Sequence, residues 1–174
     1  MENWNEIQKT VHDGELNNSV RSKNRRLAIS SVPIQTARTF TAWTHRHLAP
    51  PVDAEFVIGV HSAGGALVGV AFVDRPGCWA FDDDCTAEIT CLSTDGTPNA
   101  CSALLGAAWR FSRVKGYRRL IAYTRADESG TSLHAAGFHR VAATAAGWNQ
   151  VSRADQGTAR TRVLWEITAR GGRS

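Results

Sequence analysis

The sequence predicts one mixed α/β domain, a layered α+β arrangement in which helices flank a mixed central sheet. Three observations support this fold class. The length of 174 residues is typical of a single domain. A composition with 43% hydrophobic and 21% charged residues excludes a wholly disordered or fibrous chain. Segments with helical periodicity also alternate with β-rich runs, in the order helix, hairpin, strand, helix, strand, short helix, strand.

The N-terminal stretch 1–29 differs in composition from the rest. It is polar and rich in Asn, and its basic residues gather near its end at Arg21, Lys23, Arg25 and Arg26. We assign 1–29 to a basic extension and 30–174 to a single domain. The extension is either a solvated segment, a short helix packed on the outside, or a basic arm that reaches for phosphate. It has no apolar core typical of a secretory signal, and no apolar run long enough for a membrane span exists, so we expect a cytoplasmic protein.

The first half of the domain contains a helix and a hairpin. Ser31 and Pro33 are helix-start signals, and the helix is expected to end near Pro50-Pro51. Its apolar or small residues recur at three- and four-residue steps, at Ile34, Ala37, Phe40, Thr41, Thr44 and Leu48. Two β-rich runs follow, 55–61 and 66–73, joined by a Ser-Ala-Gly-Gly turn that favours a hairpin.

The second half contains a strand over 86–94, a turn over 95–99 and a helix that ends at Lys115-Gly116. The apolar stripe of this helix is Leu104, Ala107, Ala108, Phe111 and Val114. A strand over 119–124, a short helix over 131–136 and a last strand near 163–167 complete the domain.

Charge and cysteine content restrict the function only broadly. A net charge of +4 and a pI near 9.2 leave a nucleic-acid or phosphate-bearing partner open, but many soluble enzymes have the same balance. The spacings of the four cysteines match no paired zinc motif, so we expect buried, reduced thiols and assign no metal site. They are Cys78, Cys85, Cys91 and Cys101.

The run ITCLSTDGTPNACSALLGAAWRFSRVKGYRRLIAYT, followed by SGTSLHAAGF, resembles the acyl-CoA-binding half of the GNAT acyltransferase superfamily. The likeness extends over about residues 30–168. In that family a central strand leads into a helix whose N-terminus holds the coenzyme pyrophosphate, the next strand splays away, and a helix ending in Gly-Phe follows. Here that pair is Gly137-Phe138. The resemblance implies a GNAT-like acyl-CoA N-acyltransferase fold, acetyl-CoA or another acyl-CoA as cofactor, and an amine acceptor.

A second resemblance is to small phage- and prophage-borne GNAT-like proteins. It depends on His45-Arg46-His47, Pro50-Pro51, Glu88–Leu92 and Asp95–Ser102. These proteins in turn resemble the Mom-type phage proteins that modify adenine in DNA, through Glu88, Asn99, Ser102 and Tyr123. This implies an alternative function, a nucleic-acid-modifying protein that contacts phosphate through its basic extension and Arg118-Arg119.

The chain departs from the common GNAT pattern at named positions. The usual pyrophosphate loop, Gln/Arg-x-x-Gly-x-Gly/Ala, is replaced by TPNACS. Leu133 stands where a general-acid tyrosine often lies, and Cys91 and Pro98 stand where the closer relatives tend to have arginine. A third possibility is therefore a non-catalytic binding module on this fold. The partner is expected to be an amine-bearing small molecule or a nucleic acid, and a homodimer is possible.

For the coenzyme, the resemblance implies that strand amides near Leu92 and Ser93 orient the thioester arm. The turn into the helix would hold the pyrophosphate, because a helix N-terminus presents unpaired N–H groups and a partial positive charge. Its residues are Thr97, Asn99, Ala100, Cys101 and Ser102. From local sequence alone, Asn99 or Ser102 is equally compatible with an ordinary N-cap that needs no ligand.

Glu88 is the candidate general base. Alternation along its strand predicts that Glu88, Thr90 and Leu92 share one face. A carboxylate facing a half-dry cleft has a raised pKa and could accept the proton of an attacking ammonium, directly or through water. The alternative is an ordinary solvent-facing strand residue.

Three further residues are catalytic candidates. Tyr123 closes an apolar strand and could protonate the departing thiolate in place of the acid missing at Leu133, or it is simply a half-buried tyrosine. His45 and His47 end the first helix. They could contact substrate or act in acid–base chemistry, ligate a metal with a further residue, or complement the helix dipole.

Overall fold

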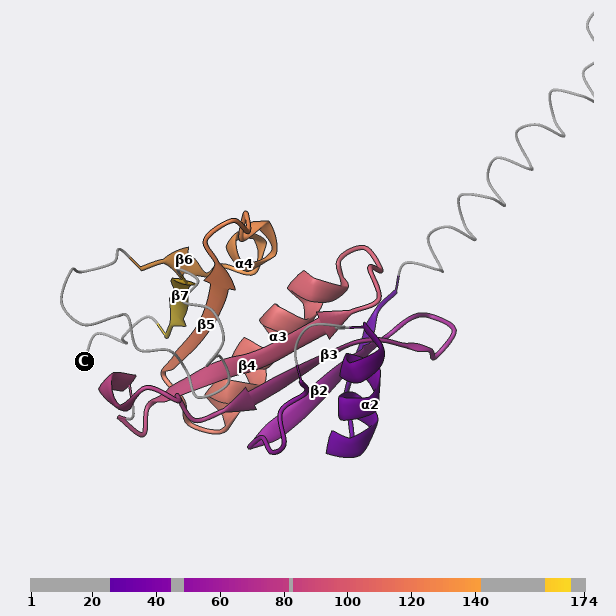
Figure 1. Ribbon diagram of the computed structural model, residues 1–174, viewed down its shortest axis with the longest axis horizontal. Helices are drawn as coiled ribbons and strands as arrows, with labels where there is room; N and C mark the ends of the chain where they lie inside the picture. Colours follow the sequence, from indigo (N-terminus) through magenta and orange to yellow (C-terminus); the bar gives the residue numbers. More distant parts are fainter. Residues whose placement is uncertain (1–25, 45–48, 82, 142–161, 170–174) are drawn as a thin grey trace, which may run out of the picture.

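The computed structural model describes residues 26–44, 49–81, 83–141 and 162–169 (Figure 1). They form a mixed sheet with helices, as predicted. Its strands are β1 (Ala28–Ser31), β2 (Phe56–His61), β3 (Leu67–Asp74), β4 (Thr86–Thr94), β5 (Arg119–Arg125), β6 (His139–Arg140) and β7 (Arg162–Thr168). Its helices are α2 (Ile34–Thr44), α3 (Ala100–Val114), α4 (Thr131–Ala135) and the single 3-10 turn η1 (Trp79–Phe81).

The strands form one seven-stranded sheet in the order β1-β2-β3-β4-β5-β7-β6. Strands β4 and β5 are parallel, and the other neighbouring pairs are antiparallel. The predicted hairpin is confirmed: β2 and β3 are joined by a turn in which Ser62 N donates to Ala66 O at 2.8 Å. The sequence pattern did not predict the edge strands β1 and β6, which are short and mostly exposed. Strand β1 begins inside the stretch that we assigned to the extension.

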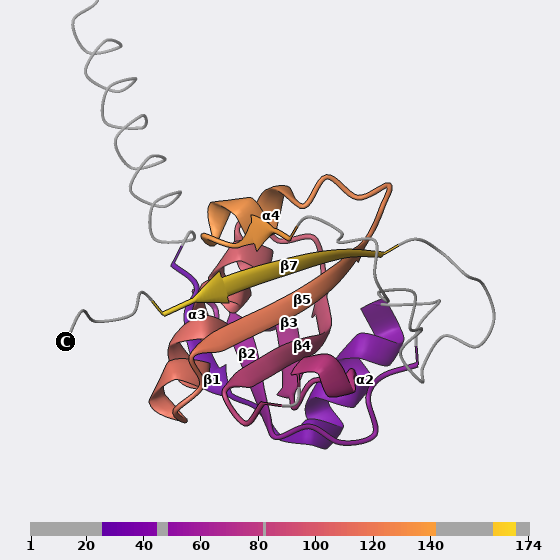
Figure 2. The ribbon, with the colours of Figure 1, turned by 90° about the vertical axis from the view of Figure 1, so that its left-hand side faces the viewer.

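Helices cover both faces of the sheet (Figure 2). On one face, α3 buries Leu104 and Ala108 in a cluster with Ile58 and Val73. The short helix α4 adds Leu133 to that same cluster. On the opposite face, α2 buries Ala37 against Val57 and Phe72. Strands β2 and β3 contribute side chains to both clusters. Each of these strands is therefore a nearly continuous run of apolar, buried residues.

A β-bulge interrupts β4 in its middle. Ile89 pairs with Val73 and Cys91 pairs with Phe72, which leaves Thr90 as an extra residue. Ile89 and Leu92 therefore both pack toward α3, whereas Cys91 packs toward α2. The prediction that Glu88, Thr90 and Leu92 share one face is thus wrong, because one inserted residue reverses the alternation for the rest of the strand.

Strands β4 and β5 separate beside this bulge. Their pairs run from Thr86–Arg119 to Ile89–Ala122, whereas β4 continues to Thr94 and β5 to Arg125. Figure 1 shows the two strands diverging from their shared start. We call this opening the split. The split ends beside the turn into α3. The gap between β4 and β5 therefore lies next to the N-terminus of α3.

Candidate active site

The backbone of β4 offers the first polar group of the candidate site. Asp95 N donates to Val68 O at 3.0 Å, just beyond the last ladder pair, Thr94–Gly69. Hydrogen-bonded pairs alternate along an antiparallel ladder, so the N–H of Ser93 points toward β3 and that of Leu92 points away from β3. The Leu92 amide therefore faces the split. The side chain of Ser93 is buried, and its hydroxyl bonds the hydroxyl of Thr44 on α2.

Glu88 lies in the stretch of β4 that pairs with β5, one residue before the last pair, Ile89–Ala122. Its side chain is on the face of the sheet opposite α3. Glu88 is only 8% exposed, and its Oε2 accepts a hydrogen bond from Gly77 N at 3.0 Å. Burial raises the pKa of the Glu88 carboxyl, and the nearby Asp74 charge raises it further. The Gly77 hydrogen bond and the positive charge of Arg162 lower this pKa but do not reverse the shift. The group therefore holds its proton more tightly than an ordinary glutamate does.

Tyr123 is the first residue of β5 beyond the last pair with β4. It packs in a small apolar cluster with Phe81, Cys78 and Leu164, on the same face as Glu88. Burial raises the pKa of Tyr123 to about 12, and the negative charge of Glu88 adds to this shift. The phenol thus remains protonated at neutral pH. The base of the split brings together a carboxyl group and a proton donor.

The turn into α3 has the geometry of a helix start without a side-chain cap. Asn99 occupies the N-cap position in the left-handed conformation, with φ of 66°, and its side chain makes no capping hydrogen bond. Ser102 Oγ instead donates to Asn99 O at 3.2 Å. The ordinary capping role that we left open is therefore not adopted by either side chain.

The same turn leaves backbone donors for a ligand. Ala100 N donates to Thr97 O and Ala103 N donates to Asn99 O. Between them lie the amides of Cys101 and Ser102, which belong to the first turn, where helices leave N–H groups without intrahelical partners. The first turn contains no acidic residue that would compete with an anion. This arrangement suits a phosphate group.

Helix α2 borders the site on the side of β4. The thiol of Cys91 lies under this helix beside Thr41, and burial raises the pKa of Cys91 to about 11. It is therefore a neutral thiol at physiological pH. Leu133, at the position of the usual general acid, is only 6% exposed and packs in the core under α3, so it offers no proton donor.

Several predicted residues are not brought to the site by the described part of the chain. His45 and His47 lie outside the described residues, as does the basic segment 1–25. Arg118 lies at the start of β5, at the paired end of the strands rather than at the split. Within the described residues, no group of three His, Cys, Asp or Glu side chains is placed to hold a metal ion. No described helix is long and apolar enough to cross a membrane.

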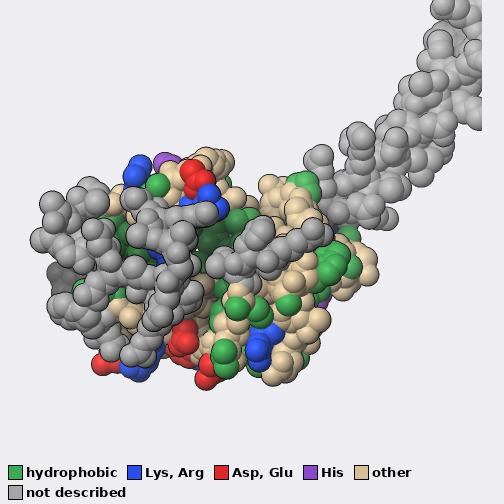
Figure 3. All heavy atoms as spheres, in the orientation of Figure 1, with side chains coloured by type: hydrophobic (Ala, Val, Ile, Leu, Met, Phe, Trp, Pro, Cys, Tyr) green, Lys and Arg blue, Asp and Glu red, His purple; other side chains and the backbone are tan. Residues whose placement is uncertain are grey.

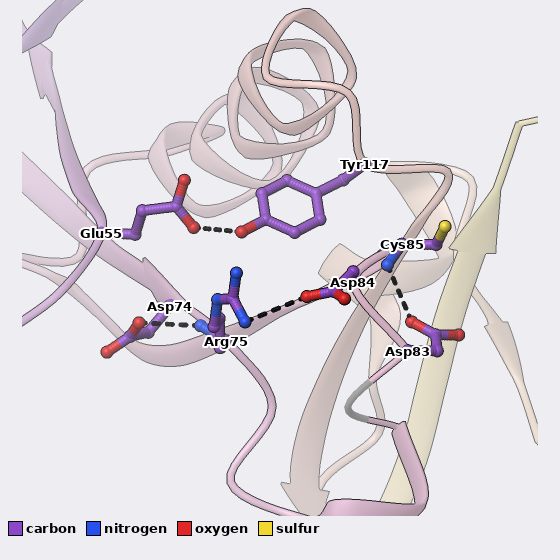
Figure 4. A network of polar contacts seen from close by, with 7 residues as sticks. All are labelled: Glu55, Asp74, Arg75, Asp83, Asp84, Cys85 and Tyr117. Carbon is purple, nitrogen blue, oxygen red and sulfur yellow. Dashed lines mark hydrogen bonds and ion pairs between the residues drawn. The ribbon is translucent and has the colours of Figure 1, made fainter.

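Local sequence patterns did not indicate a pocket of about 370 Å³ beside the end of β3, where Asp74 pairs with Glu88. It is lined by Asp53, Ala54, Glu55, Asp74, Arg75 and Tyr117. The Tyr117 hydroxyl donates to Glu55, and Arg75 pairs at 3.0 Å with Asp84, which lies outside this lining (Figure 4). On the face shown in Figure 3, described acidic and basic side chains lie interspersed.

Comparison with known proteins identifies the fold. Neither a protein-family model nor a curated protein sequence matches this chain. Solved structures of other proteins do match it. The yncA protein of Salmonella typhimurium, solved with acetyl-CoA, matches with a TM-score of 0.59 and 14% identity, over 82% of this chain and 93% of that one. The ribosomal-protein-S18-alanine N-acetyltransferase of Escherichia coli matches with a TM-score of 0.59 and 13% identity, over 84% and 97% of the two chains.

A third structure, the dodecameric spermidine N-acetyltransferase of Vibrio cholerae, matches with a TM-score of 0.58 and 12% identity, over 83% of this chain and 95% of that one. The predicted GNAT-like fold is therefore confirmed. At these identities the likeness establishes the fold, and the chemistry has to be argued from the site itself.

Proposed function

We propose that this protein transfers an acyl group from an acyl-CoA, with acetyl-CoA as the first donor to test, to the amine of a small-molecule acceptor. The observation that carries the proposal is the split between β4 and β5, with Glu88 and Tyr123 on one face at its base. The N-terminus of α3 lies at the far end of the same strand. The shared fold supports the proposal, because several proteins with this fold are N-acetyltransferases.

The coenzyme would lie along β4. As the family resemblance implies, the backbone of β4 near Leu92 and Ser93 would orient the thioester arm, and the buried Ser93 hydroxyl bonds Thr44 on α2. The α3 turn, formed by Thr97, Asn99, Ala100, Cys101 and Ser102, would hold the pyrophosphate with its first-turn amides. The uncapped Asn99 side chain and a first turn of α3 without an acidic residue fit an anionic group, whereas the Thr97 amide already donates to Asp95 Oδ1 at 2.8 Å. When bound, acyl-CoA supplies an activated thioester carbonyl.

Glu88 would accept the proton that the amine loses as it is acylated, directly or through a water molecule. A pKa raised above that of an ordinary glutamate makes this carboxylate a stronger base near neutral pH. Tyr123 would donate its proton to the coenzyme sulfur as the carbon–sulfur bond breaks, and it would regain one from Glu88 or solvent.

His45 and His47 follow α2 and are proposed to contact the acceptor or to assist proton transfer. The DNA-modifying alternative depends on these two residues, on the basic extension and on Arg118-Arg119. His45, His47 and residues 1–25 of the extension lie outside the described residues, and Arg118 and Arg119 lie at the paired end of β4 and β5, so no described observation favours this alternative. A cytoplasmic location and a homodimer remain predictions.

Calorimetric titration with acetyl-CoA tests the coenzyme site. We expect micromolar binding to the wild type and weaker binding to the Asn99→Gly and Ser102→Ala variants. Binding that neither substitution weakens would contradict the α3 turn as its site. If the folded protein binds neither acetyl-CoA nor coenzyme A, the acyltransferase proposal is wrong and a binding module on this fold becomes the better description.

A further inference from the structure

Helix α2 packs on the stretch of β4 that follows the bulge. Cys91 packs against the apolar cluster under α2, and Ser93 pairs with Val70, which belongs to that cluster. The ladder between β4 and β5 ends at Ile89, so this stretch extends beyond the last pair on its β5 side. Its position therefore depends on β3 and on the helices that cover the two faces of the sheet.

A chain of two hydrogen bonds connects this stretch to the last turns of α2. The Thr44 hydroxyl donates to Phe40 O at 2.9 Å and also bonds the Ser93 hydroxyl. Because a hydroxyl has one hydrogen, the Ser93 hydroxyl is the donor in the second bond. Ser93 is only 1% exposed, so bulk water does not compete for its hydroxyl. The two bonds fix the Thr44 hydroxyl and tie the backbone of α2 to β4.

Stability alone gives little reason for a polar contact at this place. The surrounding interface is apolar, with Ala37, Val70 and Phe72 buried in it. A buried bond between two hydroxyls adds little net stability, because each group gives up its bonds to water, and an apolar pair of the same shape is nearly as stable. What the hydrogen bond adds is direction. It fixes the distance and the register between α2 and β4, which an apolar contact does not do.

We infer that Ser93 and Thr44 are positioning residues for the coenzyme: their hydrogen bond sets the path of β4 beside the split, so that the backbone of the strand can orient the thioester arm. This inference rests on the proposed acyltransferase function and adds two side chains to it. The pyrophosphate would bind at the α3 turn, beyond the end of β4. The Ser93–Thr44 bond should therefore affect the binding of the arm and leave the binding of the nucleotide half of the coenzyme unchanged.

The test measures two ligands by calorimetry on the full chain. One is acetyl-CoA, and the other is adenosine 3′-phosphate 5′-diphosphate, the portion of coenzyme A that lacks the arm. The variants are Ser93→Ala, Thr44→Val, the two combined, and Thr44→Ser, which keeps the hydroxyl. Thr39→Val is the matched control, because Thr39 lies on the exposed side of α2 and its hydroxyl donates to Gln35 O at 3.0 Å, as that of Thr44 does to Phe40 O.

We expect the double variant to bind acetyl-CoA about 3- to 10-fold more weakly than the wild type, the effect of one hydrogen bond, and the nucleotide fragment equally well. The losses in the two single variants should not add, because both remove the same bond. Thr44→Ser and Thr39→Val should behave as the wild type.

Thermal denaturation keeps the folded state in view. The double variant should melt within about 3 °C of the wild type, because removing both hydroxyls leaves no unpaired buried donor. Thr44→Val alone should melt at a lower temperature, since it leaves the buried Ser93 hydroxyl without its acceptor.

Unweakened acetyl-CoA binding to the double variant would overturn the inference while leaving the acyltransferase function intact. An equal loss for acetyl-CoA and the nucleotide fragment, or the same loss in Thr39→Val, would overturn it as well, because the effect would then be a general one on the fold. If the wild type binds neither acetyl-CoA nor coenzyme A, the proposed function fails and the inference fails with it.

Discussion

The Gly77 amide donates a 3.0 Å hydrogen bond to Glu88 Oε2, so the loop after β3 lies against a carboxylate on β4. This contact fixes the orientation of Glu88 and helps to bury it. The donor is neutral and therefore lowers the pKa of the carboxyl by less than burial raises it. A glutamate in this setting is held in place and binds a proton more tightly than an ordinary glutamate does.

Replacing Glu88 by glutamine tests its role as the base. The amide oxygen of glutamine can still accept from Gly77, so we expect the free energy of unfolding to change by no more than about 1 kcal/mol. Acetyl transfer should fall about 10²- to 10⁴-fold, which is the range for loss of a general base. Steady-state kinetics and thermal denaturation give the two values. Full activity, or an unfolded variant, would refute the assignment. Glu55→Gln serves as a control, because Glu55 bonds Tyr117 and Lys115 and is not one of the proposed site residues.

The raised pKa of Glu88 makes a prediction about stability and pH. The folded chain holds this proton more tightly than the unfolded chain, whose glutamates have an ordinary pKa of 4.5. The resulting stabilisation is complete below that value and is lost as the pH rises through the raised pKa of the folded state. The melting temperature of the wild type relative to Glu88→Gln should therefore fall as the pH is increased across this window. Parallel curves for the two proteins would contradict the burial effect.

The two tyrosines of the chain form a matched pair for testing the proton donor. In both, burial is the main cause of a pKa raised to about 12, but Tyr123 lies at the split, whereas Tyr117 precedes β5 and bonds Glu55. We expect Tyr123→Phe to lower kcat about 10²-fold or more, with an unchanged affinity for acetyl-CoA. Tyr117→Phe should leave kcat unchanged. A similar loss in the two variants would indicate an indirect structural effect.

Variants at Asn99 separate backbone from side-chain effects at the α3 turn. Asn99 has a φ of 66°, which glycine adopts freely and alanine does not. Asn99→Gly should therefore keep the stability of the fold and weaken acetyl-CoA binding several-fold, whereas Asn99→Ala should also lose about 1 kcal/mol of stability. Calorimetry and thermal melts measure both effects. Unweakened binding to a stable Asn99→Gly protein would show that the Asn99 side chain does not contact the coenzyme.

Gly130, which precedes α4, makes a prediction about stability. It has a φ of +65°, and a Cβ there would lie 2.1 Å from Cζ2 of Trp165. The Trp165 ring is buried, and its Nε1 donates to Thr124 Oγ1 at 2.9 Å. We expect Gly130→Ala to cost about 2 kcal/mol or more in the free energy of unfolding, from strain and overpacking together. Gly96→Ala, where φ is also positive but the space is open, should cost less.

Local sequence predicted most elements because their signals are local. The prolines and the apolar spacing around Ile34 indicated α2, the Ser62–Gly65 turn indicated the β2–β3 hairpin, and Gly116 indicated the end of α3. Strand β1 could not be predicted in this way. It has four mostly exposed residues, and it is defined by pairing with β2, which lies about thirty residues away in the chain.

The residue types of the candidate site were visible in the sequence: an acid within an apolar strand at Glu88, a strand-end phenol at Tyr123, and a small-residue turn from Thr97 to Ser102. Tertiary structure decided how they meet. The bulge at Thr90 sets which face Leu92 occupies, the β4–β5 register puts Tyr123 on the face of Glu88, and the β3–β4 pairing brings Gly77 to the Glu88 carboxylate. Periodicity describes residues a few positions apart, whereas these relationships depend on the pairing of distant strands, which no local pattern encodes.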